Sequence, residues 1–142
     1  MQRGTTLVEL VIVLTIIGLL SALAVPRLAG VLDGLAVRRA VNETMVFYGT
    51  ARFGAMVRGS RVRIEFTPDS MVAVYETSND SVFLRRDGPA KNGVELSSSR
   101  TVIRIHPNGI GSGGSNTKLV FMRGEYAESL TTSRLGRLKK WN

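Results

Sequence analysis

The chain has 142 residues, no cysteine, one histidine (His106) and a formal net charge of +8. This length accommodates one helix and one small domain, but not two domains. The lack of cysteine excludes disulfides, thiolate zinc sites and cysteine nucleophiles, and a single histidine disfavours a histidine-based metal site or catalytic triad. The positive charge favours anionic partners, namely nucleic acid, lipid head groups or acidic protein subunits.

The N-terminal stretch is apolar enough to cross a membrane. Between Arg3 and Arg27 the only ionisable side chain is Glu9, and residues 10–25 are almost wholly apolar. About 20 helical residues match a hydrocarbon core of about 30 Å, so we expect a transmembrane helix over residues 5–26. A carboxylate inside such a helix is costly, which makes Glu9 a candidate functional residue with a partner.

Apolar residues recur at steps of three and four through residues 27–59, which predicts an amphipathic continuation of the same helix. Its apolar face is expected to contain Leu28, Val31, Leu32, Leu35, Val41, Met45 and Tyr48, widened by Val37, Ala40, Thr44, Ala51 and Ala55. Pro26 lacks an N–H group and is expected to kink the helix. The basic residues Arg38, Arg39, Arg52 and Arg58 suit a solvated or subunit-facing side of the helix, with a DNA-facing side as the alternative.

Residues 60–142 are expected to form an antiparallel β-sheet domain. Gly59 and Ser60 end the helix, and about eight short segments of alternating polarity follow, separated by turn residues. One polar face along these strands indicates a sheet whose other face packs on the helix. The glycine-rich stretch at residues 106–114 has no lysine and no following helix, so it is expected to be a loop and not a phosphate-binding P-loop.

The C-terminus is basic. The residues from 134 to 140 include Arg134, Arg137, Lys139 and Lys140 but no acid, and Trp141 follows. In a strand, Arg137, Lys139 and Trp141 point to the same face, which could follow phosphates and stack a base. The alternatives are a basic edge strand that resists aggregation, or a surface that faces the next subunit.

The N-terminal motif resembles the class III signal of type IV pilins and pseudopilins. The residues that carry the resemblance are a basic leader ending in Gly4, Glu9 as the fifth residue after it, the apolar run, and Pro26. The resemblance implies that residues 1–4 are a leader, that a prepilin peptidase cuts between Gly4 and Thr5, and that Thr5 is N-methylated. The family normally has Phe or Met where this chain has Thr5.

The same resemblance gives Glu9 a role in assembly. In the family, this glutamate neutralises the N-terminal amine of a neighbouring subunit, here that of Thr5, and sets the axial register of the filament. The alternative is that Glu9 lies at the depth of the lipid head groups, near the cytoplasmic face. The resemblance also implies an α+β fold, the pilin-like ladle, in which a long N-terminal helix packs against an antiparallel β-sheet domain.

Three later stretches resemble the FimT/GspH-like minor pseudopilins: residues 36–66, residues 103–114, and the end of the chain from Tyr126. The implied function is a minor pilin or pseudopilin subunit of a type IV pilus or type II secretion filament. Its implied partners are the prepilin peptidase, other pilin subunits and the inner-membrane assembly platform. It would cross the bacterial inner membrane once, with the C-terminal domain periplasmic or extracellular.

DNA-uptake minor pilins that resemble this subfamily bind DNA, without sequence preference, through a Gly-Arg-x-Arg tail. Gly136, Arg137 and Lys139 match that tail, with lysine in place of the last arginine. Lysine keeps the charge but loses the bidentate guanidinium. The alternative function is therefore a DNA receptor for natural transformation that uses Arg134, Gly136, Arg137, Lys139 and Lys140. The sequence offers no nucleophile–base pair, and we expect no enzymatic activity, cofactor or metal.

Overall fold

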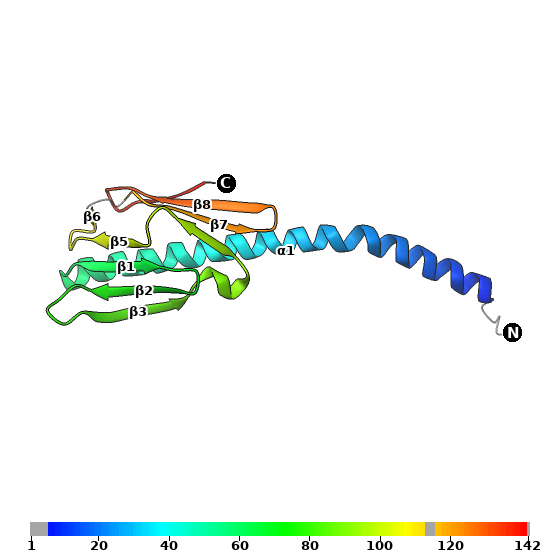
Figure 1. Ribbon diagram of the computed structural model, residues 1–142, viewed down its shortest axis with the longest axis horizontal. Helices are drawn as coiled ribbons and strands as arrows, with labels where there is room; N and C mark the ends of the chain where they lie inside the picture. The colour runs from blue at the N-terminus through cyan, green and yellow to red at the C-terminus, as the bar shows by residue number, and fades with distance from the viewer. Residues whose placement is uncertain (1–5, 113–115, 142) are drawn as a thin grey trace. The chain divides into compact units, whose positions relative to one another are not determined.

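The computed structural model describes residues 6–112 and 116–141, and of residues 24–26 only the helical backbone. Within these residues, one long α-helix precedes nine strands and one short 3-10 helix (Figure 1). The elements are α1 (Leu7–Arg58), β1 (Val62–Phe66), β2 (Ser70–Tyr75), β3 (Ser81–Asp87), η1 (Pro89–Asn92), β4 (Glu95–Ser98), β5 (Val102–Ile105), β6 (Gly111–Ser112), β7 (Lys118–Arg123), β8 (Tyr126–Thr132) and β9 (Leu138–Trp141). The chain divides into two units, Met1–Leu32 and Asp33–Asn142.

The helix α1 has defined ends. At its start, the backbone N–H of Glu9 donates to the hydroxyl of Thr6 at 3.3 Å, as an N-cap residue does. At its end, Gly59 follows with a φ of 63°, a left-handed conformation that favours glycine after a helix. The backbone is helical through Pro26, and the kink expected there stays a prediction.

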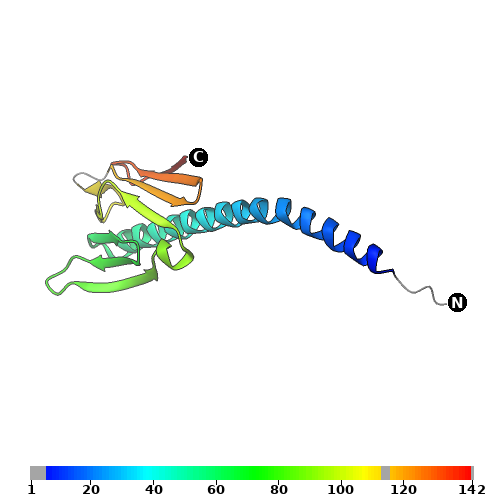
Figure 2. The same ribbon diagram turned by 45° about the vertical axis from the view of Figure 1, so that its right-hand side comes forward.

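All strand pairs are antiparallel, and the strands form two sheets in the second unit. Sheet A has the order β3-β2-β1-β5-β6, and sheet B has the order β4-β7-β8-β9. Figure 2 shows both sheets beside the C-terminal half of α1. The predicted α+β fold, a long N-terminal helix packed on antiparallel strands, is confirmed.

The core lies between the inner faces of the two sheets and one stripe of α1. The buried stripe consists of Val37, Ala40, Val41, Thr44, Phe47, Tyr48, Ala51 and Ala55. Sheet A contributes Val62, Ile64 and Phe66, whereas sheet B contributes Leu119, Phe121 and Leu130. Several of the helix residues are small, so the sheets can approach the helix backbone closely.

The sheets cover only the C-terminal part of the predicted apolar face. Leu28, Val31, Leu32 and Leu35 are exposed, and the buried stripe begins only at Val37. The helical periodicity identifies apolar positions correctly, but it does not say how far along the helix the sheets reach.

The eight predicted strands are present, but they form two sheets where the sequence indicated one. The ninth strand, β6, lies inside the predicted glycine-rich loop, where Ile105 pairs with Gly111. Alternation of polarity reports which face of a strand is buried, whereas the choice of neighbouring strand depends on contacts that are distant in the sequence.

Tyr48 is a buried polar group on the stripe. Its hydroxyl has no hydrogen-bond partner among the described residues. Burial raises the pKa of Tyr48 above its ordinary value of 10.0, although the positive charge of Arg52 opposes the shift. The folded state therefore holds the neutral phenol more strongly than the unfolded state does.

This difference predicts a pH dependence of the Tyr48→Phe variant. As the pH rises above about 10, Tyr48 ionises in the unfolded chain first, so the free energy of unfolding of the wild type falls by up to about 1.4 kcal/mol per pH unit. The Tyr48→Phe variant lacks this loss, and at neutral pH it should be at least as stable as the wild type. Urea unfolding of both proteins at pH 7 to 11 measures the difference. Parallel stability curves would contradict the interpretation.

Candidate functional site

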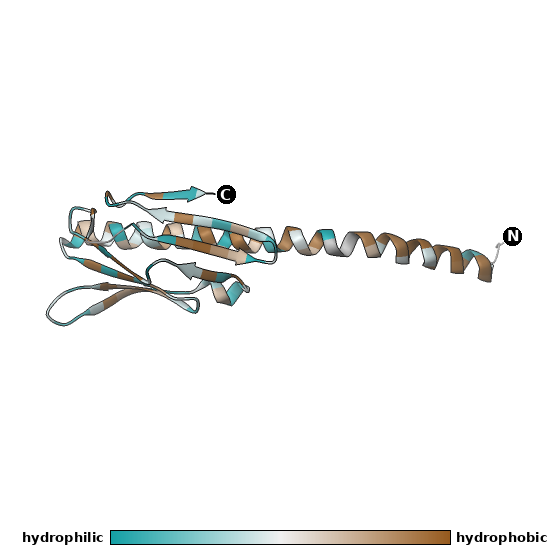
Figure 3. Cartoon of the chain, turned by 45° about the horizontal axis from the view of Figure 1, so that its top comes forward, coloured by the Kyte–Doolittle hydropathy of each residue, from teal (hydrophilic) through white to brown (hydrophobic). Residues whose placement is uncertain are grey.

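The N-terminal half of α1 is the first candidate site. Its residues from Leu7 to Leu23 are exposed. They are nearly all apolar, and Figure 3 shows this half of the helix mostly in the hydrophobic colour. By length and composition, α1 is the one described helix that could cross a membrane. Glu9 is exposed in its first turn, and Gly4 and Thr5, the residues of the predicted cleavage and methylation, lie outside the described residues.

The outward face of α1 in the second unit is also apolar. Val46, Phe53 and Val57 are 69%, 62% and 68% exposed, and they follow one another at helical spacing. Between them lies Gly49, where an added Cβ would meet nothing within 4 Å. A large exposed apolar stripe of this kind is typical of an interaction surface.

The four arginines of this half of the helix have partners within the chain. The contacts are Arg38 with Glu128 (3.7 Å), Arg39 with Glu43 (2.8 Å), Arg52 with the carbonyl of Gly109 (2.9 Å), and Arg58 over the ring of Tyr75 (4.7 Å). These contacts favour a structural role for the arginines over contact with DNA.

The C-terminal strand β9 is the second candidate site, and it forms one edge of sheet B. Its neighbour β8 places Thr131 opposite Lys139 and Ser129 opposite Trp141. The ammonium of Lys139 lies 3.8 Å from the centre of the Trp141 ring, and the indole N–H donates to the hydroxyl of Thr131 at 2.9 Å. Lys139 and Trp141 thus share one face, as predicted, and the tryptophan is held in place on it.

Lys140 points the other way. Its ammonium lies 2.8 Å from a carboxylate oxygen of Glu128, whose side chain is only 11% exposed. The charge of Lys140 is therefore partly neutralised within the domain. Of the predicted tail residues, it is the one that the structure separates from the exposed basic face.

The exposed face of β9 that carries Lys139 and Trp141 continues to Lys118 of β7, which the sequence did not indicate. Thr131 pairs with Lys118 of β7 on one side and with Lys139 of β9 on the other, so the two lysines lie in one row across sheet B. Among the described residues, neither ammonium has an acidic partner. No pattern near Lys118 in the sequence points to β9, because only the strand register brings the two lysines together.

Arg134, Gly136 and Arg137 form the turn that leads into β9. The carbonyl of Arg134 accepts the N–H of Gly111 at 2.9 Å, which ties the turn to β6. Gly136 has a φ of 70°, and an added Cβ would lie 2.2 Å from the carbonyl oxygen of Gly109. Arg137 follows directly and is exposed.

The glycine-rich stretch is a tight turn at its described beginning. The N–H of Gly109 donates to the carbonyl of His106 at 2.8 Å, and the φ of Gly109 is 77°. Within residues 6–112 and 116–141, no cluster of three His, Cys, Asp or Glu side chains could hold a metal ion.

Comparisons with known proteins show that this chain is similar to pilins in its N-terminal motif, in sequence and in fold. Residues 1–25 match the family described as the prokaryotic N-terminal methylation motif. Two fimbrial proteins of Pseudomonas aeruginosa are 33% identical to it over 100 residues, which are 70% of this chain and 62% of each relative. The chain thus spans less than two thirds of the length of these curated relatives.

Two crystal structures of the type IV minor pilin FimU of Pseudomonas aeruginosa have the same fold, with TM-scores of 0.64 and 0.62 and 13% identity. The alignments cover 75% and 74% of this chain, and 88% and 92% of the FimU chains. The motif, the relatives and the fold together confirm the predicted resemblance to type IV pilins.

The turn before β9 gives a matched pair of variants. Gly136 and Gly59 both have positive φ, so alanine costs about 1 to 2 kcal/mol at either place from backbone strain. At Gly59 an added Cβ meets nothing within 4 Å, whereas at Gly136 it collides with the backbone of Gly109. We expect Gly136→Ala to lower the free energy of unfolding clearly more than Gly59→Ala does, as measured by urea unfolding. Equal losses would contradict the tight contact with Gly109.

Proposed function

We propose that this type IV pilin-like chain is a minor pilin subunit. Its N-terminal helix would first anchor it in the bacterial inner membrane. The same helix would later pack into the filament of a type IV pilus or of the related type II secretion system. The observation that carries the proposal is the methylation motif at residues 1–25 on a chain with the pilin fold. The second unit, Asp33–Asn142, would lie on the periplasmic side.

Processing follows from the same motif. A prepilin peptidase would cut between Gly4 and Thr5 and leave Thr5 as a methylated N-terminus. The helix would then pass to the inner-membrane assembly platform and to other pilin subunits. Helix capping fits a cut at this place, because a cut before Thr5 leaves Thr6, which caps α1, on the mature chain.

Glu9 would pair with the amine of Thr5 on a neighbouring subunit. In a bundle of apolar helices an unpaired carboxylate costs several kcal/mol, which an adjacent ammonium offsets. The apolar residues of α1 around Glu9 are exposed in the single chain, so they are free to pack against other helices. The exposed stripe of Val46, Phe53 and Val57 would extend the same packing along the second unit.

The Glu9→Ala variant tests this role. We expect it to reach the membrane at the wild-type level, because the span becomes more apolar, but to fall by about tenfold or more in the sheared filament fraction. Thr15→Ala is the matched control, because the hydroxyl of Thr15 already bonds the carbonyl of Val11 in its own helix at 2.8 Å. Immunoblots of membrane and filament fractions measure both steps. A Glu9→Ala protein that assembles like the wild type would overturn the proposed pairing.

A second candidate function is binding of DNA without sequence preference. The observation that favours it is the row of Lys118 and Lys139 on sheet B, with the Trp141 ring fixed on the same face. Arg137, two residues before Lys139, is exposed in the turn that leads into this strand. Ammonium and guanidinium groups on one face can follow a phosphate backbone. One side of the indole carries Lys139, so a base would have to stack on the other side.

DNA binding by the full chain in detergent micelles, followed against salt, tests this candidate. Each phosphate contact contributes about 0.9 to the slope of log affinity against log salt on duplex DNA. The Arg137→Ala/Lys139→Ala variant should therefore lose about 1.8 of that slope. Lys140→Ala is the control and should change the slope little, because Lys140 pairs with Glu128. If the wild type does not bind DNA at low salt, the basic face is architectural.

A further inference from the structure

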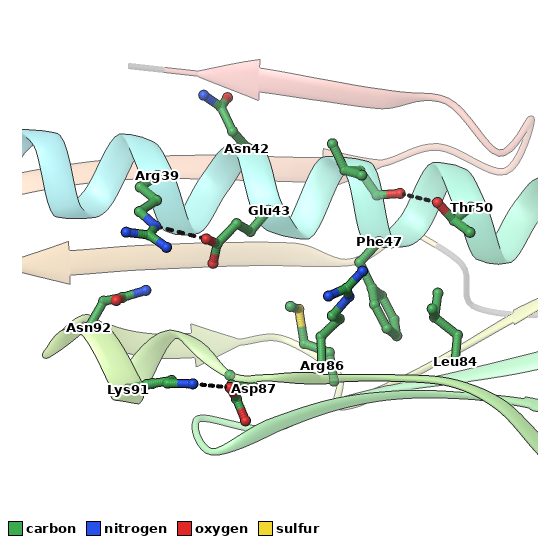
Figure 4. Close-up of a pocket in the computed structure, with 13 residues that line it drawn as sticks. Arg39, Asn42, Glu43, Phe47, Thr50, Leu84, Arg86, Asp87, Lys91 and Asn92 are labelled. Atoms are coloured by element: carbon green, nitrogen blue, oxygen red, sulfur yellow. Dashed lines mark hydrogen bonds and ion pairs between the residues drawn. The ribbon is translucent and has the colours of Figure 1, made fainter.

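A groove runs along α1 on the side of sheet A that ends in β3. One wall is α1 from Arg39 to Thr50, and the other consists of β3 and η1 (Figure 4). Phe47 and Met71 line its depth, and the volume is about 470 Å³. This volume lies in the range of sites that bind organic ligands, roughly 300 to 1,000 Å³.

The groove continues towards the start of the second unit. A second hollow of about 520 Å³ reaches Leu35 and shares Arg39, Lys91 and Asn92 with the first. At about 1.5 Å per helical residue, the distance from Leu35 to Thr50 is roughly 22 Å. A polypeptide in β conformation covers that distance with roughly six or seven residues.

The wall formed by β3 is an open sheet edge. β3 is the last strand of sheet A in the described chain, so one side of its backbone has no strand partner there. At seven residues it is one of the two longest strands. An open edge of this length beside a groove is the geometry in which an extended peptide adds to a sheet as a further strand.

Of the three basic side chains that line the groove, one has no partner among the described residues. Arg39 pairs with Glu43 at 2.8 Å, and Lys91 pairs with Asp87. The guanidinium of Arg86, in contrast, has no ion-pair or hydrogen-bond partner among the described residues, although it lines the groove. Guanidinium groups prefer carboxylates, which they bind with two parallel hydrogen bonds.

The neighbouring arginine lies on the other face of the sheet. Arg86 pairs with Met71, which is buried on the inner face, whereas Arg85 pairs with Val72, which stands opposite Glu65 on the outer face. An arginine that only protected the edge from aggregation would need no groove with the apolar side chains of Phe47 and Met71 beside it. Leu84 lies on the same face as Arg86 and adds an apolar surface next to the charge.

We propose that this groove binds an extended acidic segment of another protein, which adds to sheet A along β3, places a carboxylate on Arg86 and packs apolar side chains on Leu84, Phe47 and Val46. Alternate residues of an added strand face the groove, so the segment would carry its acid and its apolar residues two positions apart. All residues of the site belong to the second unit. Val46 is the one residue that the groove shares with the stripe proposed to pack in the filament, so the site is tested on the single chain.

Binding of a designed peptide to the full chain in nanodiscs of uncharged lipid tests the proposal. The probe is the fluorescein-labelled peptide Val-Thr-Glu-Thr-Val-Thr, which presents Val, Glu and Val on one face, and the comparison peptide has Lys in place of Glu. We expect saturable binding of the acidic peptide, measured by fluorescence anisotropy. Arg86→Glu should weaken it by about tenfold or more, since a charge-assisted pair is lost.

Arg85→Glu is the matched control, because it makes the same change of charge one residue away on the opposite face. It should leave the affinity of the acidic peptide within about twofold, since its charge lies on the solvent side of the sheet. Arg86→Glu should in turn bind the Lys peptide better than the wild type does. If Arg86→Glu does not fold, as judged by circular dichroism, Arg86→Gln and Val46→Ser replace it, and each should weaken binding. No saturable binding to the wild type, or equal losses at Arg85 and Arg86, would overturn the proposal.

Discussion

Close packing of two sheets on a single helical stripe is the constraint on which the second unit depends. The stripe alternates small residues such as Ala40, Ala51 and Ala55 with large ones such as Phe47. Small residues let the strands approach the helix, and large ones fill the space between sheets A and B. The stripe covers only one side of α1, so the opposite side, with Val46, Phe53 and Val57, remains exposed. One helix therefore supplies both the core of its own domain and an exposed apolar surface.

The sequence predicts the elements well, because helix and strand leave local periodicities of different length. The long helix, its end at Gly59 and the eight main strands follow from these patterns and from turn residues. The division into two sheets does not, because it depends on which strand lies beside which. The same limit applies to the candidate site. The charge of Lys139 is visible in the sequence, but its alignment with Lys118, and the pairing of Lys140 with Glu128, exist only through the register of β7, β8 and β9.

One junction links the two sheets near the end of α1. The guanidinium of Arg52 donates to the carbonyl of Gly109, and Gly136 packs against that same carbonyl. The turn after β5 in sheet A and the turn before β9 in sheet B thus meet at one helix residue. Both the positive φ at position 136 and this close contact favour glycine there. The Gly-Arg motif predicts a DNA-binding role for Gly136, which stays a prediction. The positive φ of Gly136 and its contact with Gly109 show in addition that it positions the turn from which Arg137 projects.

The open edges of the two sheets differ in a way that separates the two candidate binding surfaces. β9 is short, and its lysines are held by Trp141 on one face and by Glu128 on the other. Such an edge is poorly suited to accept another strand but well suited to present charge. β3 is longer and adjoins the groove, where the exposed guanidinium of Arg86 has no partner among the described residues. Glu43 and Asp87 on the rim of that groove already neutralise Arg39 and Lys91, so a polyanion would find few free positive charges there. A single carboxylate on an extended chain can instead pair with Arg86.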